Sequence, residues 1–213
     1  MATILFSRPA DDTQLSYLHY YSKELVDYAV RKGHKAINKE LQEANKKKII
    51  SLIQSQKPEL LMFNGHGSSN VICGYKQEVI IDINNIRLLK DTITYSLSCS
   101  SADVLGKEAI KNGTICFIGY ESEFALGKDP DSEASPRHDK ITKLFLEPSN
   151  ILFSSLIEGD QVNTAVIKAK KKMWENISYL NTTKSFPEAI FYAPFLFGNY
   201  ICLVAHGNKE ASI

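Results

Sequence analysis

The sequence predicts an α/β fold, with a mostly parallel sheet of about six strands, helices on both faces and a small hairpin. Short apolar runs of strand length alternate along the 213 residues with longer stretches whose apolar residues recur at helical spacing. This alternation is typical of a parallel sheet covered on both faces. A hydrophobic fraction of 44% and a charged fraction of 23% suit a chain that buries a core. The length favours a single domain over residues 1–213.

The first half of the chain alternates regularly between the two kinds of segment. Strands are predicted where short apolar runs meet turn-forming residues, over 3–6, 34–37 and 59–63. Helices are predicted over 15–29, with capping residues at Asp11–Thr13, and over 39–56, with a lysine-rich outer face. The small hairpin is expected from the apolar runs 71–75 and 78–81.

The second half continues the pattern around one polar stretch. We expect a short helix at 84–90, strands at 93–98 and 114–119, and a helix capped by Ser101–Asp103 that ends at Lys111. Residues 120–139 are polar and contain glycine and two prolines, which predicts a long mobile loop. Further helices are predicted at 141–157, interrupted near Pro148, and 160–179. An irregular aromatic segment at 186–197 and a last strand at 199–205 complete the chain.

Two of the apolar runs end at a reactive side chain that small residues follow. The run in 60–69 delivers His66 between Gly65 and Gly67, and the run in 94–102 delivers Cys99, 33 positions later. Active sites of open α/β sheets gather beyond the carboxyl ends of the strands. A histidine and a thiol placed there are the parts of a Cys-His dyad. The pattern therefore indicates a cysteine hydrolase.

The chemistry of such a dyad assigns a role to each residue. Cys99 is the expected nucleophile and His66 the general base and acid, because a thiol must ionise before it attacks. The N–H groups of Gly67 and Cys99 are the expected oxyanion hole, with Cys99 placed just before a helix start. Taken separately, the two residues are equally explained as a packed thiol and a turn histidine. The other cysteines are expected in the core; they are Cys73, Cys116 and Cys202.

At these residues the sequence resembles the caspase-like superfamily of cysteine peptidases (clan CD), and in particular its CHAT and gingipain-type domains. The segments that carry the resemblance are 63–67, 96–102 and 192–199. The last has Asn199 where the CHAT pattern has Asp, and the caspase pentapeptide around the nucleophile is absent. The resemblance implies a three-layer fold, cleavage of a peptide bond after one preferred side chain, and no metal or organic cofactor.

The same resemblance places the primary specificity pocket on segments 7–12, 96–98 and 120–126. Four acidic residues in or beside these segments would accept lysine or arginine; they are Asp11, Asp12, Glu121 and Glu123. Leu97 would instead suit an apolar preference. For any one of these acids, a helix cap (the two aspartates) or a solvated loop (the two glutamates) is the more common explanation, so the preference stays open.

Composition excludes several other classes of function. A net charge of +1 and a pI of about 7.6 give no sign of nucleic acid or a membrane surface as partner. The lysine runs at 46–48 and 168–172 lack interleaved aromatic residues and are expected to be solvated helix faces. The cysteines and histidines show no metal-ligand spacing. With no signal peptide visible, the expected location is cytoplasmic.

The sequence therefore predicts a cysteine endopeptidase that cleaves a protein or peptide. We expect its control by a regulatory protein partner, by assembly or by cleavage within 120–139, and the resemblance suggests a bacterial defence or signalling system. The oligomeric state stays open. Two other interpretations remain: a catalytically inactive caspase-like scaffold for protein interactions, and a flavodoxin-like binding module in which the dyad is accidental.

Overall fold

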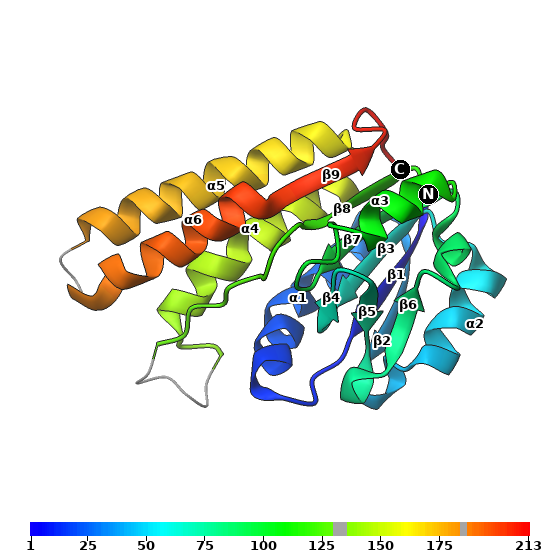
Figure 1. Cartoon of the computed structure of the whole chain (residues 1–213), viewed down its shortest axis with the longest axis horizontal. Helices are drawn as coiled ribbons and strands as arrows, with labels where there is room; N and C mark the ends of the chain where they lie inside the picture. Colours follow the sequence, from blue (N-terminus) through cyan, green and yellow to red (C-terminus); the bar gives the residue numbers. More distant parts are fainter. Residues whose placement is uncertain (130–135, 184–186) are drawn as a thin grey trace.

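The computed structural model describes residues 1–129, 136–183 and 187–213. Its main sheet has six strands in the order β2-β1-β3-β7-β8-β9, and every neighbouring pair is parallel except β8 and β9. The strands are β1 Thr3–Arg8, β2 Lys35–Glu40, β3 Leu60–Asn64, β7 Ile93–Leu97, β8 Cys116–Tyr120 and β9 Leu203–Gly207. This mostly parallel sheet of six strands confirms the predicted fold class (Figure 1).

Helices cover both faces of this sheet. They are α1 Thr13–Arg31, α2 Lys46–Gln56, α3 Leu105–Lys111, α4 Lys140–Ile157, α5 Val162–Thr182 and α6 Ala193–Cys202, with short 3-10 turns at Leu41–Glu43, Tyr75–Gln77, Ile86–Leu89 and Pro187–Tyr192. Side chains alternate across each strand. Ile4 and Phe6 of β1 pack towards α1, α4 and α5, whereas Leu5 packs towards α2 and α3. The result is a three-layer structure with a core on each side of the sheet.

The predicted hairpin belongs to a small antiparallel sheet. Strands β5 Val71–Cys73 and β6 Val79–Asp82 pair as expected, and a third strand, β4 Gly67–Ser68, pairs with β5. This sheet follows β3 directly, so its first strand starts next to His66 (Figure 1). It therefore fixes the direction in which the chain leaves the candidate histidine.

The helix predicted directly after Cys99 starts later than expected. Residues 98–104 form turns, and α3 begins only at Leu105. Ser100 has a positive φ of 54°, and the N–H groups of Ser100 and Ala102 bond to the carbonyls of Ser122 and Tyr120. These bonds tie the turn after Cys99 to the end of β8 and to the residues that follow it, and the left-handed φ of Ser100 is not helical. The prediction that Cys99 lies at a helix N-terminus was therefore wrong.

The C-terminal region also departs from the prediction. Residues 193–202 form α6 rather than irregular chain, and the last strand is 203–207 instead of 199–205. Pro194 lies in the first turn of α6, where its missing N–H costs nothing. Helix α4 runs through Pro148 without the expected interruption. In 120–139, residues 121–129 have no helix or strand, whereas 130–135 lie outside the described residues.

Candidate active site

Three neighbouring strands bring the site together at the carboxyl edge of the sheet. Strands β1, β3 and β7 are adjacent and parallel, and Asn64 of β3 pairs with Leu97 of β7. Both His66 and Cys99 lie two residues beyond that last pair. Asp12 lies four residues beyond the end of β1. The topology thus places a histidine, a thiol and a carboxylate at the ends of three consecutive strands.

Two glycines set the path of the chain around His66. A Cβ at Gly65 would fall 2.2 Å from the carbonyl oxygen of Cys73, and one at Gly67 would fall 2.9 Å from Oγ of Ser98. Only glycine permits backbone to approach this closely. The second contact holds the histidine segment against the residue that precedes Cys99. The N–H of Gly65 also donates to the carbonyl of Leu97, at 3.4 Å.

The imidazole of His66 is held by Asp12. Oδ2 of Asp12 lies 2.5 Å from Nε2 of His66, while Oδ1 accepts the N–H of Leu15 at 2.8 Å and so caps α1. Partial burial opposes ionisation of Asp12, but these hydrogen bonds hold the pKa of its carboxyl below the ordinary value. A carboxylate on Nε2 leaves Nδ1 as the ring nitrogen that can serve a substrate or thiol.

Cys99 lies in a turn of small residues with its side chain half-buried. Its neighbours are tightly held: Ser98 and Ser101 are buried, and Oγ of Ser98 bonds to Oγ of Ser96 at 2.6 Å. In the described parts of the chain, the N–H of Cys99 donates no hydrogen bond. A free N–H beside a half-buried thiol matches one of the two donors expected for an oxyanion hole.

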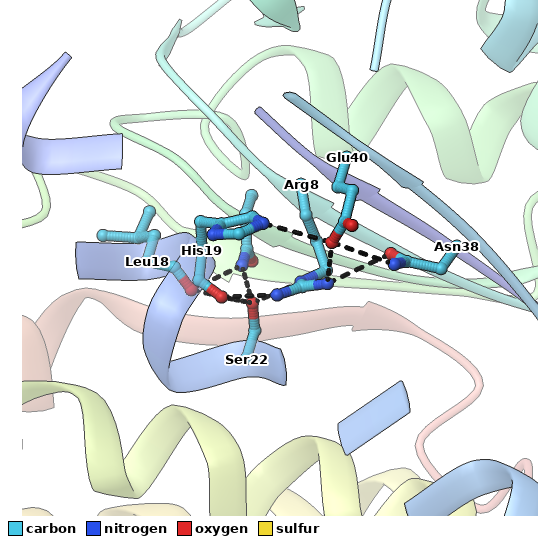
Figure 2. Close-up of polar contacts among 7 residues, drawn as sticks. Arg8, Leu18, His19, Ser22, Asn38 and Glu40 are labelled. Atoms are coloured by element: carbon cyan, nitrogen blue, oxygen red, sulfur yellow. Dashed lines mark hydrogen bonds and ion pairs between the residues drawn. The ribbon is translucent and has the colours of Figure 1, made fainter. Parts of the chain in front are cut away.

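A second polar cluster lies beside this site and centres on Arg8, the last residue of β1. Arg8 is fully buried, and Figure 2 shows its guanidinium among α1 and the ends of β1 and β2. It donates to Oγ of Ser22 (2.8 Å), Oδ1 of Asn38 (3.2 Å), Oε2 of Glu40 (3.0 Å) and the carbonyl of His19 (2.5 Å). Burial lowers the pKa of this guanidinium and Glu40 opposes the shift, so the arginine stays charged.

This Arg8 cluster is linked through one serine to β3, the strand that precedes His66. Nδ2 of Asn64 donates to Oγ of Ser22 at 2.9 Å, and the Ser22 hydroxyl donates in turn to the carbonyl of Leu18 at 2.7 Å. Asn64 ends β3, two residues before His66. The cluster therefore links α1, which carries Asp12 at its start, to the strand that carries His66. Both partners of the Asp12–His66 contact are positioned from the same buried network.

The structure gives separate surroundings to the other residues expected to bind substrate. Asp11 accepts the N–H of Lys76 at 2.8 Å. Leu97 is 2% exposed and packs in the core. Glu121 lies 3.3 Å from Nζ of Lys107 and 3.5 Å from Nε2 of His206. Glu123 is exposed and forms no ion pair with any described residue. Among the three acids, Asp11 and Glu121 have polar partners in the described residues, and Glu123 has none there.

The segment that carries Glu121 and Glu123 is fixed on both sides. Its Ser122 carbonyl accepts the N–H of Ser100, directly after Cys99. Two residues past Glu123, the N–H and carbonyl of Ala125 bond to the side-chain amide of Asn199, at 2.9 and 2.8 Å. An amide supplies both the donor and the acceptor that this pairing needs, whereas a carboxylate supplies only acceptors. Asn199, which is 1% exposed, thereby holds this segment beside the turn that contains Cys99.

Sequence reasoning missed the contact between Asp12 and His66. The two residues are 54 positions apart, and the sequence presented Asp12 as a helix cap or a substrate-binding acid. The cap is confirmed, and the bond to His66 is the added finding. Only the pairing of β1 with β3 brings these positions together, and no local pattern encodes that pairing.

Two further kinds of site are not found in the described residues. Within residues 1–129, 136–183 and 187–213, no group of three histidine, cysteine or acidic side chains could hold a metal ion. Across the same ranges, every helix is too short or too polar to cross a membrane.

Comparison with known protein families gives no match, and comparison with curated proteins gives none either. Solved structures do match. The Arg-specific cysteine proteinase gingipain R (RgpB) superposes with a TM-score of 0.63 and 11% identity, covering 99% of this chain and 47% of that one. A complex of the Porphyromonas gingivalis RgpB pro- and mature domains superposes with a TM-score of 0.59 and 12% identity, covering 100% of this chain and 48% of that one. The chain spans about half the length of these proteins. It has a caspase-like fold, as the resemblance in its sequence implied.

Proposed function

We propose that this protein is a cysteine endopeptidase whose nucleophile is Cys99 and whose general base and acid is His66. The observation that carries the proposal is the placement of both residues two positions beyond the paired ends of adjacent parallel strands. The contact of His66 with Asp12 supports it, because a base oriented by a third group completes the arrangement that nucleophilic catalysis requires. The likeness in fold to cysteine proteinases agrees with this chemistry.

The proposed reaction proceeds through an acyl-enzyme. The free ring nitrogen of His66 takes the proton of the Cys99 thiol, and the thiolate attacks the scissile carbonyl carbon. The N–H groups of Gly67 and Cys99 donate to the resulting oxyanion. His66 then gives its proton to the departing amine as the C–N bond breaks, and a water, deprotonated by the same imidazole, hydrolyses the thioester. Asp12 touches no reacting atom, so we assign it as the residue that orients the ring.

One feature of the described residues favours a different function. Among the described residues, Cys99 and His66 form no hydrogen bond with each other. This is what an inactive scaffold would show. Catalytic hydrogen bonds, however, are often made only once a substrate is bound. The peptidase remains our proposal because a scaffold does not require a carboxylate on the histidine ring.

Glu123 supports a preference for a basic residue before the cleaved bond. It is exposed, lies one residue after the Ser122–Ser100 contact, and pairs with no cation among the described residues. An unpaired carboxylate beside the nucleophile turn would attract lysine or arginine. Replacing Glu123 by glutamine should lower kcat/KM for basic peptides about tenfold and leave apolar peptides unchanged. Equal losses on both kinds of peptide would contradict this role.

The experiment that tests the function is cleavage of a diverse fluorogenic peptide library. The wild type should cleave a subset of the library, and Cys99→Ala and His66→Ala should each lower kcat/KM by at least about 10³-fold. Cys202→Ala, which removes another half-buried thiol, is the control and should keep activity. Cleavage that survives Cys99→Ala would refute the assignment. If nothing is cleaved and a peptidyl electrophile also fails to modify Cys99, the scaffold is the better interpretation.

A further inference from the structure

The outer edge of β9 has backbone groups that nothing in the described chain satisfies. β9 is the last strand of the sheet and pairs only with β8. Bonds from the N–H of Glu121 to Cys202 O and from the N–H of Asn208 to Ile115 O set the register of this antiparallel pair. Partner-facing residues alternate in such a ladder, so Ala205 directs its N–H and carbonyl away from β8. Among the described residues, neither group has a hydrogen-bond partner.

The neighbouring positions extend the same free edge. By the alternation that applies to Ala205, Leu203 and Gly207 also face outward. The N–H of Leu203 is used, because it bonds to the carbonyl of Asn199 at the end of α6. The free groups along the edge are therefore the carbonyl of Leu203, the N–H and carbonyl of Ala205, and the N–H of Gly207. Such a row is the template to which an incoming strand pairs.

A groove of about 270 Å³ follows this edge between β9 and α5. It is lined by Asn163, Val166 and Lys170 of α5, by 203–206 of β9, and by Lys209. Its only charged lining residues are the two lysines, and neither forms an ion pair with a described residue. Burial lowers the pKa of the Lys170 ammonium, and the positive charge of Lys209 acts in the same direction. The groove is therefore short of negative charge.

The surface next to the groove is mostly apolar. No aspartate, glutamate, lysine or arginine occurs from Ala189 to Asn208, and His206, the histidine in this stretch, lies 3.5 Å from Glu121. On α6, Phe197 and Ile201 are 41% and 57% exposed, and the Tyr200 ring beside them lies 5.2 Å from Nζ of Lys170. Exposed apolar surface that adjoins a free strand edge is a common sign of a binding face. It would accept the apolar side chains of the molecule that the lysines attract.

We propose that the β9 edge binds an extended acidic segment of a partner protein, which adds to the sheet as a seventh strand. Carboxylates of such a segment would meet Lys170 and Lys209, while its apolar residues cover the exposed side chains of α6. A second copy of this chain fits less well, because a two-fold contact brings the same lysines to both sides of the seam. The proposal does not depend on the peptidase activity.

The test uses fluorescein-labelled hexapeptides in which valine or threonine alternates with aspartate or glutamate, and a matched set with lysine as the charged residue. Fluorescence anisotropy with the full chain should show binding of the acidic set alone, weakened by added salt. Lys170→Glu and Lys209→Glu should each weaken binding about tenfold. Lys171→Glu changes the next residue of α5, which is exposed and does not line the groove, and should change the affinity less than about twofold.

The position of the peptide is read by hydrogen exchange of the backbone. A bound acidic peptide should protect the amide of Ala205, and it should do so equally in Cys99→Ala, which separates this site from the catalytic one. Several results would overturn the proposal: no acidic peptide of the set binds, basic peptides bind as well, or Lys171→Glu weakens binding as much as Lys170→Glu. Concentration-dependent dimerisation that Lys170→Glu strengthens would assign the edge to a second copy instead.

Discussion

Two polar clusters lie side by side at the carboxyl edge of the sheet, and they differ in how completely their hydrogen-bonding groups are used. The guanidinium of Arg8 is fully buried and donates to four groups. The side chains of His66 and Asp12 are 29% and 37% exposed, and Cys99 beside them is half-buried. Each nitrogen of the Arg8 guanidinium has a partner, so we call its cluster closed, whereas the second, open cluster keeps a ring nitrogen and a thiol available.

The difference shows how one sheet edge can serve two purposes. A buried charge needs all of its hydrogen bonds, since each missing one costs free energy that water would otherwise supply. The Arg8 guanidinium has a partner at each of its three nitrogens, and through Ser22 it links α1 to the end of β3. A catalytic group instead needs one reactive or hydrogen-bonding atom that is left free for the substrate. We therefore expect changes to the closed cluster to alter stability and changes to the open cluster to alter rate.

Among the substitutions that test this comparison between the two clusters, the largest effect is expected at Asp12. Asp12→Asn should keep the cap on α1 but can no longer hold His66 as a carboxylate does, so kcat should fall about 10²-fold with little change in KM. The matched control is Asp11→Asn, which alters the adjacent carboxylate that bonds to Lys76 instead. Steady-state kinetics on a cleaved library peptide would measure both. Similar losses for the two variants would mean that Asp12 acts only through the local fold.

The closed cluster is tested by removing its carboxylate. Glu40→Ala leaves the buried Arg8 charge without its ion-pair partner and should lower the free energy of unfolding by about 2 kcal/mol, with kcat nearly unchanged. The expected loss is smaller than for a fully buried pair because the Glu40 side chain is 43% exposed. Glu43→Ala, which breaks the exposed pair with Lys48, should cost less than about 0.5 kcal/mol in urea unfolding. A large fall in kcat for Glu40→Ala would remove the distinction between the clusters.

The smallest effect concerns pH. Burial lowers the pKa of the His19 imidazole. The positive charge of Arg8 lowers this pKa further, whereas Glu40 raises it. As pH falls, the unfolded chain therefore takes up this proton before the folded chain does, and the folded state loses stability. The free energy of unfolding should decrease between about pH 7 and about pH 5, and His19→Gln should flatten that decrease. Equal slopes for the two proteins would show that His19 titrates alike in both states.

The sequence predicted those parts of the fold that local patterns encode. The buried strands that carry His66 and Cys99 are each short apolar runs, and their order along the chain was enough to place both residues at one edge. The start of α3 was missed because the turn after Cys99 is held by bonds from the N–H groups of Ser100 and Ala102 to the carbonyls of Ser122 and Tyr120, and no local pattern encodes these contacts. Residues 193–202 are apolar and contain aromatic residues, so the run itself does not distinguish a strand from a helix.

The Arg8 cluster was not predicted at all, because local sequence patterns do not encode contacts between distant segments. Its members come from β1, α1 and β2, and each is unremarkable in its own segment. Arg8 reads in the sequence as a turn residue before Pro9. Its complete burial follows only from the packing of α1 against the strand ends, which depends on contacts between segments far apart in the chain.

The most direct test of the central claim compares thiols within the native protein. Cys99 and Cys202 are both half-buried. Cys116 is the first residue of β8, at the opposite edge of the sheet from Cys99, and burial raises its pKa to about 12. Mass spectrometry after brief treatment with iodoacetamide should find Cys99 modified at least about tenfold faster than Cys202, and His66→Ala should abolish that advantage. A Cys99 that reacts no faster than Cys202, or equally fast without His66, would contradict the assignment of the dyad.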